Sequence, residues 1–517
     1  MSTRRFYITT AIPYVNGDPH LGFALECVQA DVLARHRRQR GERVHFLSGT
    51  DDNSLKNVVA AEAAGAPIAE FVNAKAERFA ALREPLELSY DDFIRTSVDL
   101  RHRPGAERLW RACAASGDLY ERHYEGLYCT GCEAFLRPSE LDAGLCPEHH
   151  CEPERIAERN WFFRLSRYEG KLLELIESGR LRIEPDQRRN EVLGFIRGGL
   201  EDFSVSRSRE RARGLGIPVP EDPSQVIYVW FDALANYISA LDYGTGGERY
   251  REWWERSDER VHVIGKGIIR FHAVYWPAML IAAGLEVPRQ VYAHGYLLVG
   301  GEKMGKSNAT GVRPAELVEH FGVDCYRYYF LREISFGQDG TFSWESMEQR
   351  YITDLANDLG NLANRVLTMV GSYRGGVVPE ATGEPGEAEC ALAADHATAV
   401  EGVRAFDRLE FKRGLEDVWA LVGGVNRYVE ARRPWALHKA AADADLDRCL
   451  ATCVDALRVI AVLVSPVMPD AAAALWDKLG LPEALAEQRY PAAAALGGTP
   501  AGTRVDRGAL LFPRLEE

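Results

Sequence analysis

The run Phe6-Tyr-Ile-Thr-Thr10 lies near the start of the chain and is followed by a helical pattern from about Leu21 to Arg40 and a second β-rich run, Val44–Leu47. Strand, helix and strand in this order are typical of a parallel α/β sheet with right-handed crossovers. Two further candidates for buried strands, Val261–Ile264 and Val291–Tyr292, come much later. We therefore expect an α/β fold with a Rossmann-like parallel sheet that is split by an insertion.

The remaining sequence predicts an insertion that carries a cysteine cluster and a C-terminal part made of helices. The cluster lies between Cys129 and Cys151. After about residue 345, Leu355, Leu359 and Leu362 recur at three- and four-residue steps, as on one face of a helix. We expect two catalytic halves at 1–116 and 216–320, a connective insertion at 117–215, a connector at 321–348 and an all-α bundle at 349–517.

Composition limits the function classes. The chain has 517 residues, too many for one compact core, and its 46% hydrophobic and 27% charged residues are usual for a water-soluble protein. It has neither a signal-peptide pattern nor an apolar run of membrane-spanning length, so we expect a cytoplasmic protein without a membrane segment. The formal net charge of -14 argues against non-specific coating of nucleic acid. A local basic run such as Arg35–Arg40 or Arg207–Arg213 could still hold one nucleic-acid partner.

A first candidate for a nucleotide-binding segment runs from Ala11 to Phe23 and leads into the predicted helix. Gly22 lets a ligand approach the backbone, and the N-terminus of the helix offers free N–H groups and a partial positive charge to phosphate. His20 adds a hydrogen-bond donor. The competing interpretation is an ordinary Pro/Gly turn with a surface histidine.

A second candidate segment is Gly301-Glu-Lys-Met-Gly-Lys-Ser307, which places two lysines three residues apart between glycines. Such a loop can close over a triphosphate and stabilise the charge that develops on departing pyrophosphate. Taken alone, a lysine-rich loop is usually only solvated. The two segments lie at opposite ends of a split sheet, and this combination predicts one triphosphate site.

The cysteine cluster predicts a structural zinc site. Cys129-Thr-Gly-Cys132 is followed by Cys146-Pro-Glu-His149, and this spacing suits a closed tetrahedral site with thiolate ligands in a reducing compartment. His150 and Cys151 lie beside His149, so the fourth ligand stays open. The alternative is that these residues are unconnected.

Together these segments resemble class I aminoacyl-tRNA synthetases and, among them, the methionyl-tRNA synthetases. His20-Leu-Gly22 and Lys303-Met-Gly-Lys-Ser307 correspond to the two signatures of the class. Other family-like stretches are Ala11–Tyr14, Tyr228–Tyr237, Phe271-His272 with Trp276–Leu280, Ala293–Gly295 and Phe336–Gly340. The resemblance spans nearly the whole chain. It implies that methionine is activated by ATP, with Mg²⁺, to methionyl-adenylate and transferred to tRNA(Met), and that the zinc is structural.

The resemblance also implies roles for individual residues. Asp51 would hold the ammonium group of methionine, while Tyr237 and His294 would recognise its sulfur. The implied sets are His20, Lys303 and Lys306 for catalysis; His20, Gly22, Lys303, Lys306 and Ser307 for ATP; Ile12, Tyr14, Asp51, Trp230, Leu234, Tyr237 and His294 for methionine; Cys129, Cys132, Cys146 and His149 for zinc; and Asn361, Arg365 and Trp435 for the anticodon. Without the family, the helical spacing of Trp230, Leu234 and Tyr237 would indicate ordinary core. The Asn361 and Arg365 pair would indicate a solvated helix face.

The sequence departs from the family pattern in four places. Phe23 replaces a usual histidine or asparagine, and Asp51-Asp-Asn-Ser54 replaces Asp-Glu-His-Gly. Gly267 replaces an aspartate, and Gly305 replaces a serine. These changes leave open a housekeeping ligase, a divergent paralogue that resists an inhibitor or activates another amino acid, or a catalytically silent tRNA-binding protein. We expect a monomer.

Overall fold

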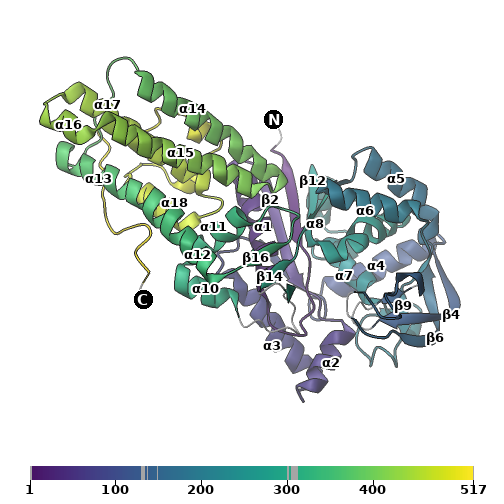
Figure 1. Cartoon of the computed structure of the whole chain (residues 1–517). Coiled ribbons are helices and arrows are strands. Elements are labelled where there is room, and N and C mark those ends of the chain that lie inside the picture. The colour runs from purple at the N-terminus through teal and green to yellow at the C-terminus, as the bar shows by residue number, and fades with distance from the viewer. Residues whose placement is uncertain are drawn as a thin grey trace.

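The computed structural model describes residues 3–129, 134–136, 138–147, 150–299, 302–303 and 312–515. Figure 1 shows a central α/β body, a region of small sheets and helices on its right, and a bundle of helices on its upper left. The C-terminal end of the chain lies beside the bundle. The candidate site lies in the central body.

The central sheet has six parallel strands in the order β3-β2-β1-β12-β13-β7. Its strands are β1 (Arg5–Thr10), β2 (Arg43–Thr50), β3 (Asp92–Arg95), β7 (Arg182–Glu184), β12 (Glu259–Gly265) and β13 (Gln290–His294). Phe6, Ile8, Phe46 and Val261 are almost fully buried, as in a sheet covered by helices on both faces. The predicted Rossmann-like parallel sheet is confirmed.

Strand β1 lies in the middle of this sheet and joins its two halves. It pairs with β2 on one side and with β12 on the other, with Ile8 opposite Phe46 and Val261. Helix α1 (Leu21–Gln39) connects β1 to β2 and is buried along most of its length. Ligands of open α/β sheets bind where the chain leaves neighbouring strands in opposite directions, so the carboxyl end of β1 is the place to look for a site.

The stretch expected to be a pure insertion also completes the main sheet. Strand β7 comes from within residues 117–215 and pairs with β13, with Ile183 opposite Val291. A strand of three residues is too short to give a periodic pattern, which is why the sequence did not predict it. Most of the rest of this stretch forms a four-stranded antiparallel sheet in the order β5-β4-β6-β8 and helices α5 and α6, while β9 pairs with β11 in a separate small sheet.

The remaining strands and α-helices outside the bundle have between 2 and 14 residues. The strands are β4 (Leu119–Cys129), β5 (Ala134–Leu136), β6 (Glu154–Phe163), β8 (Phe203–Ser204), β9 (Ser206–Ser208), β10 (Pro218–Val219), β11 (Asp222–Ile227), β14 (Leu297–Val299), β15 (Glu302–Lys303) and β16 (Gly340–Phe342). The helices are α2 (Leu55–Ala63), α3 (Ile68–Ala80), α4 (His102–Ala115), α5 (Glu169–Glu177), α6 (Asp186–Arg197), α7 (Val229–Ser239), α8 (Glu248–Tyr250), α9 (Trp276–Ala282), α10 (Pro314–Phe321) and α11 (Val323–Glu333).

The C-terminal part is helical, as the sequence predicts. Its helices are α12 (Trp344–Arg350), α13 (Asn361–Arg374), α14 (Glu387–Gly402), α15 (Phe411–Arg432), α16 (Pro434–Lys439), α17 (Asp443–Val464) and α18 (Pro469–Lys478). Residues 351–360 continue α12 into α13 as a π-helical segment. Leu355, Leu359 and Leu362, which carry the predicted helical period, are buried in the core.

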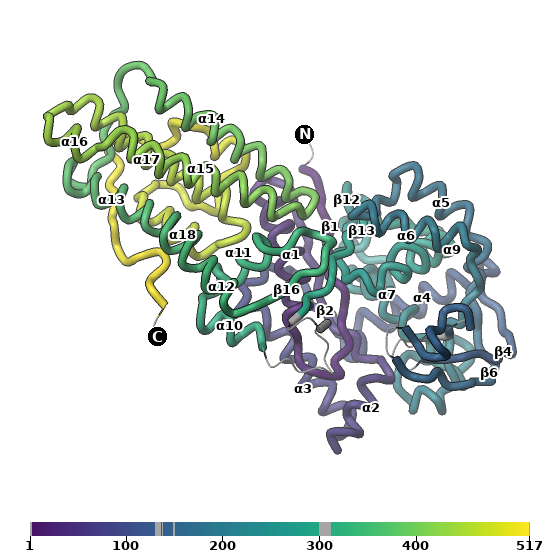
Figure 2. Tube along the Cα trace, viewed as in Figure 1, coloured from purple at the N-terminus to yellow at the C-terminus, as the bar shows by residue number. Residues whose placement is uncertain are grey.

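A buried arginine ties the bundle to the central body. Arg327 of α11 donates hydrogen bonds to the Asp31 carboxylate of α1 at 2.6 Å and to the carbonyl oxygens of Leu86, Pro466 and Val467 at 2.8–3.0 Å. Removing one partner of such a buried charge is strongly destabilising, so the junction is fixed. Figure 2 shows α1 and α11 together where the bundle meets the sheet.

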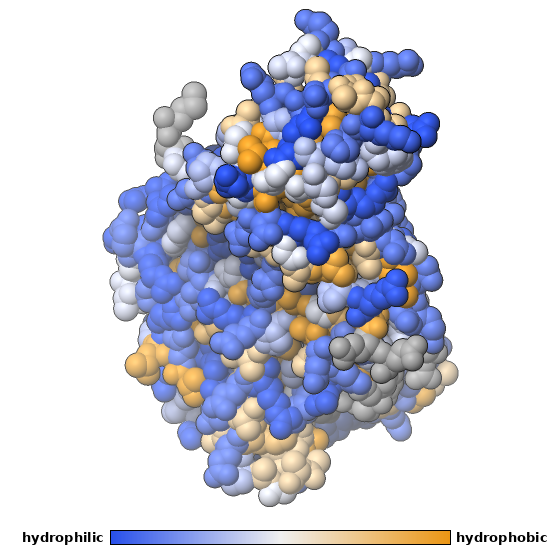
Figure 3. Space-filling view, turned by 90° about the vertical axis from the view of Figure 1, so that its left-hand side faces the viewer, coloured by the Kyte–Doolittle hydropathy of each residue, from blue (hydrophilic) through white to orange (hydrophobic). Residues whose placement is uncertain are grey.

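The surface is consistent with the composition. Seen from the side of the bundle, it is mostly hydrophilic, with apolar residues in scattered areas (Figure 3). No helix among the described residues is long and apolar enough to span a membrane.

Candidate active site

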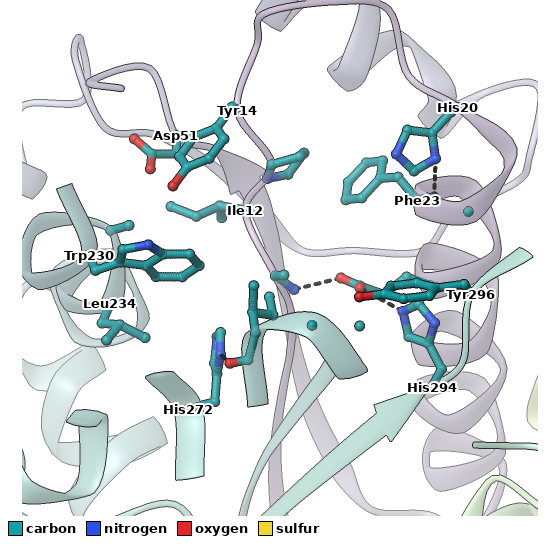
Figure 4. A pocket seen from close by; sticks show the side chains of 18 of the residues that line it. Ile12, Tyr14, His20, Phe23, Asp51, Trp230, Leu234, His272, His294 and Tyr296 are labelled. Atoms are coloured by element: carbon teal, nitrogen blue, oxygen red, sulfur yellow. Dashed lines mark hydrogen bonds and ion pairs between the residues drawn. The ribbon is translucent and has the colours of Figure 1, made fainter. Parts of the chain in front are cut away.

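A cavity of about 320 Å³ lies at the carboxyl ends of β1, β2, β12 and β13. Figure 4 shows Asp51, Tyr14, Trp230 and Leu234 on one side of it and His20, Phe23, His294 and Tyr296 on the other, with Ile12 between. All seven residues predicted to bind methionine line this cavity, and so do His20 and Gly22. The structure therefore brings together residues that are more than two hundred positions apart in the chain.

Asp51 stands at the first side of the cavity. It follows the last residue of β2, is only 1% exposed, and forms a parallel bridge with Tyr14. The backbone N–H of Asp51 donates to the Pro13 carbonyl at 3.0 Å, and the N–H of Asn53 donates to the Asp51 carboxylate at 3.1 Å. These contacts fix a carboxylate at the edge of the cavity.

Helix α7 supplies the aromatic wall on the same side. Trp230 stacks face to face on Phe271, with ring centroids 3.8 Å apart and planes 6° from parallel. Leu234 lies one helical turn further along α7 and faces the cavity beside it. Tyr237 follows at the next helical step. These residues have the spacing of core residues because they share one face of α7, and this face borders the cavity.

Tyr237 closes the floor of the cavity through a hydrogen bond to His272. Burial lowers the pKa of His272 to about 4, so its ring is neutral near pH 7. His272 Nδ1 lies 2.9 Å from the Ile268 carbonyl, which can only accept, so Nδ1 carries the proton. Nε2 must then accept, and the Tyr237 hydroxyl donates to it at 2.7 Å.

The hydrogen bonds of His294 differ from those expected of a residue that recognises the methionine sulfur. Its Nε2 lies 2.8 Å from the Glu26 carboxylate and its Nδ1 lies 2.8 Å from the Gly295 carbonyl, so both ring nitrogens are already engaged. The histidine that hydrogen-bonds to Tyr237 is His272, and the ring of His262 packs against the Tyr237 ring with centroids 4.1 Å apart. Glu26 also accepts from the N–H of Ala11 at 2.7 Å and lines the cavity, although no sequence signal indicated it.

His20 forms the N-cap of α1 at the second side of the cavity. Its Nδ1 accepts from the N–H of Phe23 at 3.2 Å. A Cβ at Gly22 would lie 3.0 Å from that nitrogen, so the absence of a side chain at Gly22 makes room for the imidazole. Phe23 packs on Phe79 with ring centroids 5.4 Å apart, so this departure from the family pattern puts an apolar ring where a donor is usual.

The second signature is described only in part. The backbone of Lys303 in β15 pairs with Leu298 of β14, directly after the cavity residue Leu297. Lys306 and Ser307 lie outside the described residues. The predicted convergence of His20 with both lysines stays a prediction.

Two family models match almost the entire chain. A model described as tRNA synthetases class I (M) matches residues 6–156 and 149–367, and one described as the anticodon binding domain of methionyl tRNA ligase matches residues 378–517. The chain belongs to the methionyl-tRNA synthetase family. Methionine–tRNA ligation is the activity of this family, and the class I enzyme expected from the signatures is confirmed.

Individual members of the family are similar over their full length. The methionine–tRNA ligase of Streptomyces coelicolor is 45% identical over 534 residues, covering 99% of this chain and 97% of the relative. A structure of Mycobacterium tuberculosis methionyl-tRNA synthetase in complex with methionyl-adenylate has a TM-score of 0.92 at 41% identity, covering 99% of this chain and 100% of that one. The free-state structure of that enzyme has a TM-score of 0.86.

The predicted zinc ligands are only partly described in this member of the family. Cys129 and Cys146 are buried, whereas Cys132 and His149 lie outside the described residues. Cys151 is exposed, and its Sγ lies 3.8 Å from Sγ of Cys129. Within the part of the chain that the structure describes, no group of three His, Cys, Asp or Glu residues could hold a metal ion.

The three residues predicted to bind the anticodon lie on the helical part. Asn361, the first residue of α13, is exposed, and Arg365 one turn later pairs with Glu430 of α15 at 2.7 Å. Trp435 is 38% exposed at the start of α16, directly after α15. The ion pair therefore links the α13 face to the end of α15 that leads to Trp435.

Proposed function

We propose that the cavity holds methionine on the side of Asp51 and α7 and ATP on the side of His20, so that the two react within it. The observation that carries this proposal is the distribution of charge and aromatic surface in Figure 4. A buried carboxylate and a stacked indole occupy one side, and a helix N-terminus with an imidazole occupies the other. The relative whose structure contains methionyl-adenylate supports a single cavity for both groups.

The methionine side suits an amino acid with a long thioether chain. The carboxylate of Asp51 would pair with the α-ammonium group, and Ile12, Trp230 and Leu234 would surround the side chain. Sulfur is polarizable and packs well against aromatic rings. Because the Tyr237 proton is donated to His272, we assign Tyr237 to shape and polarizable contact, and we assign His294 to the support of Glu26.

The nucleotide side suits a triphosphate. The free N–H groups of α1 and the imidazole of His20 would face the phosphates, and Gly22 allows their approach. Lys303, Lys306 and Ser307 would close over them from the second signature. A carboxylate oxygen of methionine attacks the α-phosphorus of ATP, and the bond from that phosphorus to pyrophosphate breaks. Mg²⁺ bound with ATP would offset phosphate charge. A hydroxyl of the terminal adenosine of tRNA(Met) then attacks the carbonyl carbon of methionyl-adenylate, the bond from that carbon to the phosphate oxygen breaks, and AMP leaves.

Amino-acid-dependent exchange of pyrophosphate into ATP tests these assignments. We expect exchange with methionine alone among the common amino acids, and a rise of roughly a hundredfold in the methionine KM of Asp51→Asn because a buried charge pair is lost. Exchange with another amino acid would support the biosynthetic paralogue, and no exchange with intact tRNA binding would support the silent protein. A normal methionine KM in Asp51→Asn would overturn the assignment of the ammonium site.

We also propose a structural zinc ion at the cysteine cluster, with Cys151 as the fourth ligand in place of His149. Zn–S bonds of about 2.3 Å at tetrahedral angles put two sulfurs roughly 3.8 Å apart. This is the separation of Cys129 and Cys151, and it is far too long for a disulfide. Cys132 and Cys146 would complete the site, and the ion would hold the end of β4 against the loop at Cys146.

Metal analysis tests the zinc proposal. We expect about one zinc ion per chain, with a strong loss in Cys151→Ser and little loss in His149→Ala. Cys390→Ser is the matched control, because Cys390 is also exposed but lies on α14 in the bundle. Loss of zinc in His149→Ala with retention in Cys151→Ser would make His149 the ligand.

We propose that Asn361, Arg365 and Trp435 read the anticodon of tRNA(Met). An exposed indole can stack on an unpaired base, and amide and guanidinium groups can bond to base edges. Trp435→Ala should lower aminoacylation kcat/KM for tRNA by roughly tenfold to a hundredfold and leave pyrophosphate exchange unchanged. Arg427→Ala, at an exposed arginine of α15, should change neither. A Trp435→Ala enzyme with normal aminoacylation would contradict this assignment.

The division of the chain into 1–116, 117–215, 216–320, 321–348 and 349–517 remains part of the proposal, as does a monomeric state. The central sheet and the helical bundle support the outer boundaries, and β7 indicates that the insertion also contributes to the sheet. Sedimentation at several concentrations should give one species of 57.7 kDa.

A further inference from the structure

A chain of hydrogen bonds runs behind the methionine side of the cavity. Asn53 Nδ2 donates to one carboxylate oxygen of Asp232 at 2.8 Å, and His102 Nε2 donates to the other. The second ring nitrogen of His102, Nδ1, lies 2.8 Å from the Ser239 hydroxyl. The side chains of His102 and Asp232 are 0% and 1% exposed, so this carboxylate depends on these two donors.

The chain connects the two elements that hold opposite parts of methionine. Asp232 and Ser239 are on α7, the helix that carries Trp230 and Tyr237. Asn53 belongs to the segment after β2, and its backbone N–H donates to the Asp51 carboxylate. Asn53 therefore contacts both elements. Its backbone contacts the Asp51 carboxylate, which we assign to the ammonium group, and its side chain contacts α7, which forms the wall around the methionine side chain.

Helix α4 supports this connection from behind. His102 is its first residue, and α4 approaches α7 so closely that a Cβ on Gly105 would lie 2.4 Å from Cβ of Ser239. A helix packed this tightly cannot shift without a clash. The imidazole of His102 therefore holds Asp232 from a fixed position. Of the two donors to Asp232, His102 is buried and Asn53 is half-buried.

We propose that Asn53, Asp232 and His102 are positioning residues that set the distance between Asp51 and α7 to the length of a methionine molecule. This inference rests on the proposed function, because it takes Asp51 as the ammonium site and α7 as the side-chain wall. Asn53 stands where the family pattern has histidine, and an imidazole N–H can also donate to a carboxylate. Asn53→His is thus the conservative variant.

Steady-state pyrophosphate exchange separates positioning from a general loss of structure. Asn53→Ala should raise the methionine KM about tenfold, because a buried carboxylate loses a charge-assisted hydrogen bond. The ATP KM and kcat should stay within about twofold, as for a loss of uniform binding. Asn53→His should return the methionine KM to within about threefold of the wild type. Asn426→Ala, on α15, is the matched control and should change nothing.

A methionine analogue without the amino group supplies the second measurement. The inhibition constant of 4-(methylthio)butyrate should change less than about twofold in Asn53→Ala, because this molecule does not need the two sites at a set distance. An equal loss for methionine and the analogue would overturn the proposal, since it would place the defect in the wall alone. A wild-type methionine KM in Asn53→Ala would also overturn it.

The outcome is distinguishable from failure of the proposed function. If Asp51→Asn keeps a normal methionine KM, the ammonium assignment fails whatever Asn53 does. If Asp51→Asn loses methionine and Asn53→Ala does not, only the positioning role fails. Thermal midpoints establish that each variant is folded, and Asn53→Ser, which replaces the amide with a shorter hydroxyl group, carries the same expectation if Asn53→Ala does not fold.

Discussion

The two sides of the cavity differ in how their polar groups are held. On the methionine side, Tyr237, His262 and His272 are buried and bonded to other protein groups, with His262 between Thr9 at 2.8 Å and Trp276 at 3.2 Å. On the nucleotide side, the polar groups that we assign to the phosphates are a cap histidine and the backbone of a helix N-terminus. Selection of a side chain requires fixed, dehydrated surroundings, whereas a phosphate chain requires N–H groups and charge that a ligand can approach.

The largest expected effect is on the nucleotide side. His20→Ala should lower kcat for pyrophosphate exchange by roughly 10²–10³-fold, because one preorganised donor to the developing charge is lost, and should leave methionine binding unchanged. His20→Asn is the control for capping, since asparagine also accepts from N–H groups at an N-cap. It should keep the stability of the wild type and still lose kcat. Full activity in His20→Asn would show that the cap alone matters and would remove the contrast between the two sides.

The next effect concerns the buried histidines of the methionine side. Burial lowers the pKa of His272 to about 4 from an ordinary value near 6.5 and lowers the pKa of His262 as well. For His272, the unfolded chain binds more protons than the folded one between pH 6.5 and about pH 4. The contribution to stability is therefore complete above pH 6.5 and is lost as the pH falls toward 4, by on the order of 3 kcal/mol for His272.

Urea unfolding at pH 7.5, 6 and 5 measures this dependence. The difference between wild type and His272→Gln isolates one histidine, because the glutamine does not titrate and other groups change alike in both proteins. We expect the wild type to lose more stability than the variant on acidification. Parallel curves would mean that His272 is not kept neutral by the fold.

Periodicity and motif order were sufficient to predict β1, β2, β12 and β13 of the sheet, helix α1 and the helical bundle. The resemblance to the family also predicted that Ile12, Asp51, Trp230 and Tyr237 lie in one pocket, and these residues line the same cavity. Partners across the fold could not be predicted. A single sequence does not reveal that Tyr237 hydrogen-bonds to His272 and not to His294. Nor does it reveal that Asn53 hydrogen-bonds to Asp232, which lies 179 positions away.

The cysteine cluster and strand β7 illustrate the same limit. Spacing indicated a metal site but could not choose among His149, His150 and Cys151, because the choice depends on how the loop folds back to Cys129. Strand β7 is defined by its pairing with β13 and not by its own composition. Local patterns predict elements, whereas ligand sets and edge strands depend on tertiary contacts.

A smaller effect is expected for the hydroxyl of Tyr237. Tyr237→Phe leaves Nε2 of His272 without its donor, which should cost about 1–3 kcal/mol of stability and raise the methionine KM by up to about tenfold. Tyr7→Phe is the matched control, because it also removes a buried phenol hydrogen bond, to the Tyr237 carbonyl, but lies behind the cavity. Tyr7→Phe should lose stability and keep its methionine KM. Equal KM values in the two variants would mean that the floor of the cavity does not contribute to methionine binding.

The smallest effect is expected at Gly22. A Cβ there would lie 3.0 Å from Nδ1 and 3.1 Å from Cε1 of His20, so the ring must move by a few tenths of an ångström. Gly22→Ala should raise the ATP KM by roughly twofold to fivefold, as expected when a positioned group is slightly displaced, without changing the methionine KM. Alanine is the better helix former, so the variant should be no less stable, and lost activity cannot then be attributed to unfolding. Gly371→Ala in α13 makes the same exchange where a Cβ meets nothing within 4 Å, and its ATP KM should equal that of the wild type. If Gly22→Ala matched Gly371→Ala in every constant, the imidazole would not need its present position, and the nucleotide side would tolerate displacements that the methionine side does not.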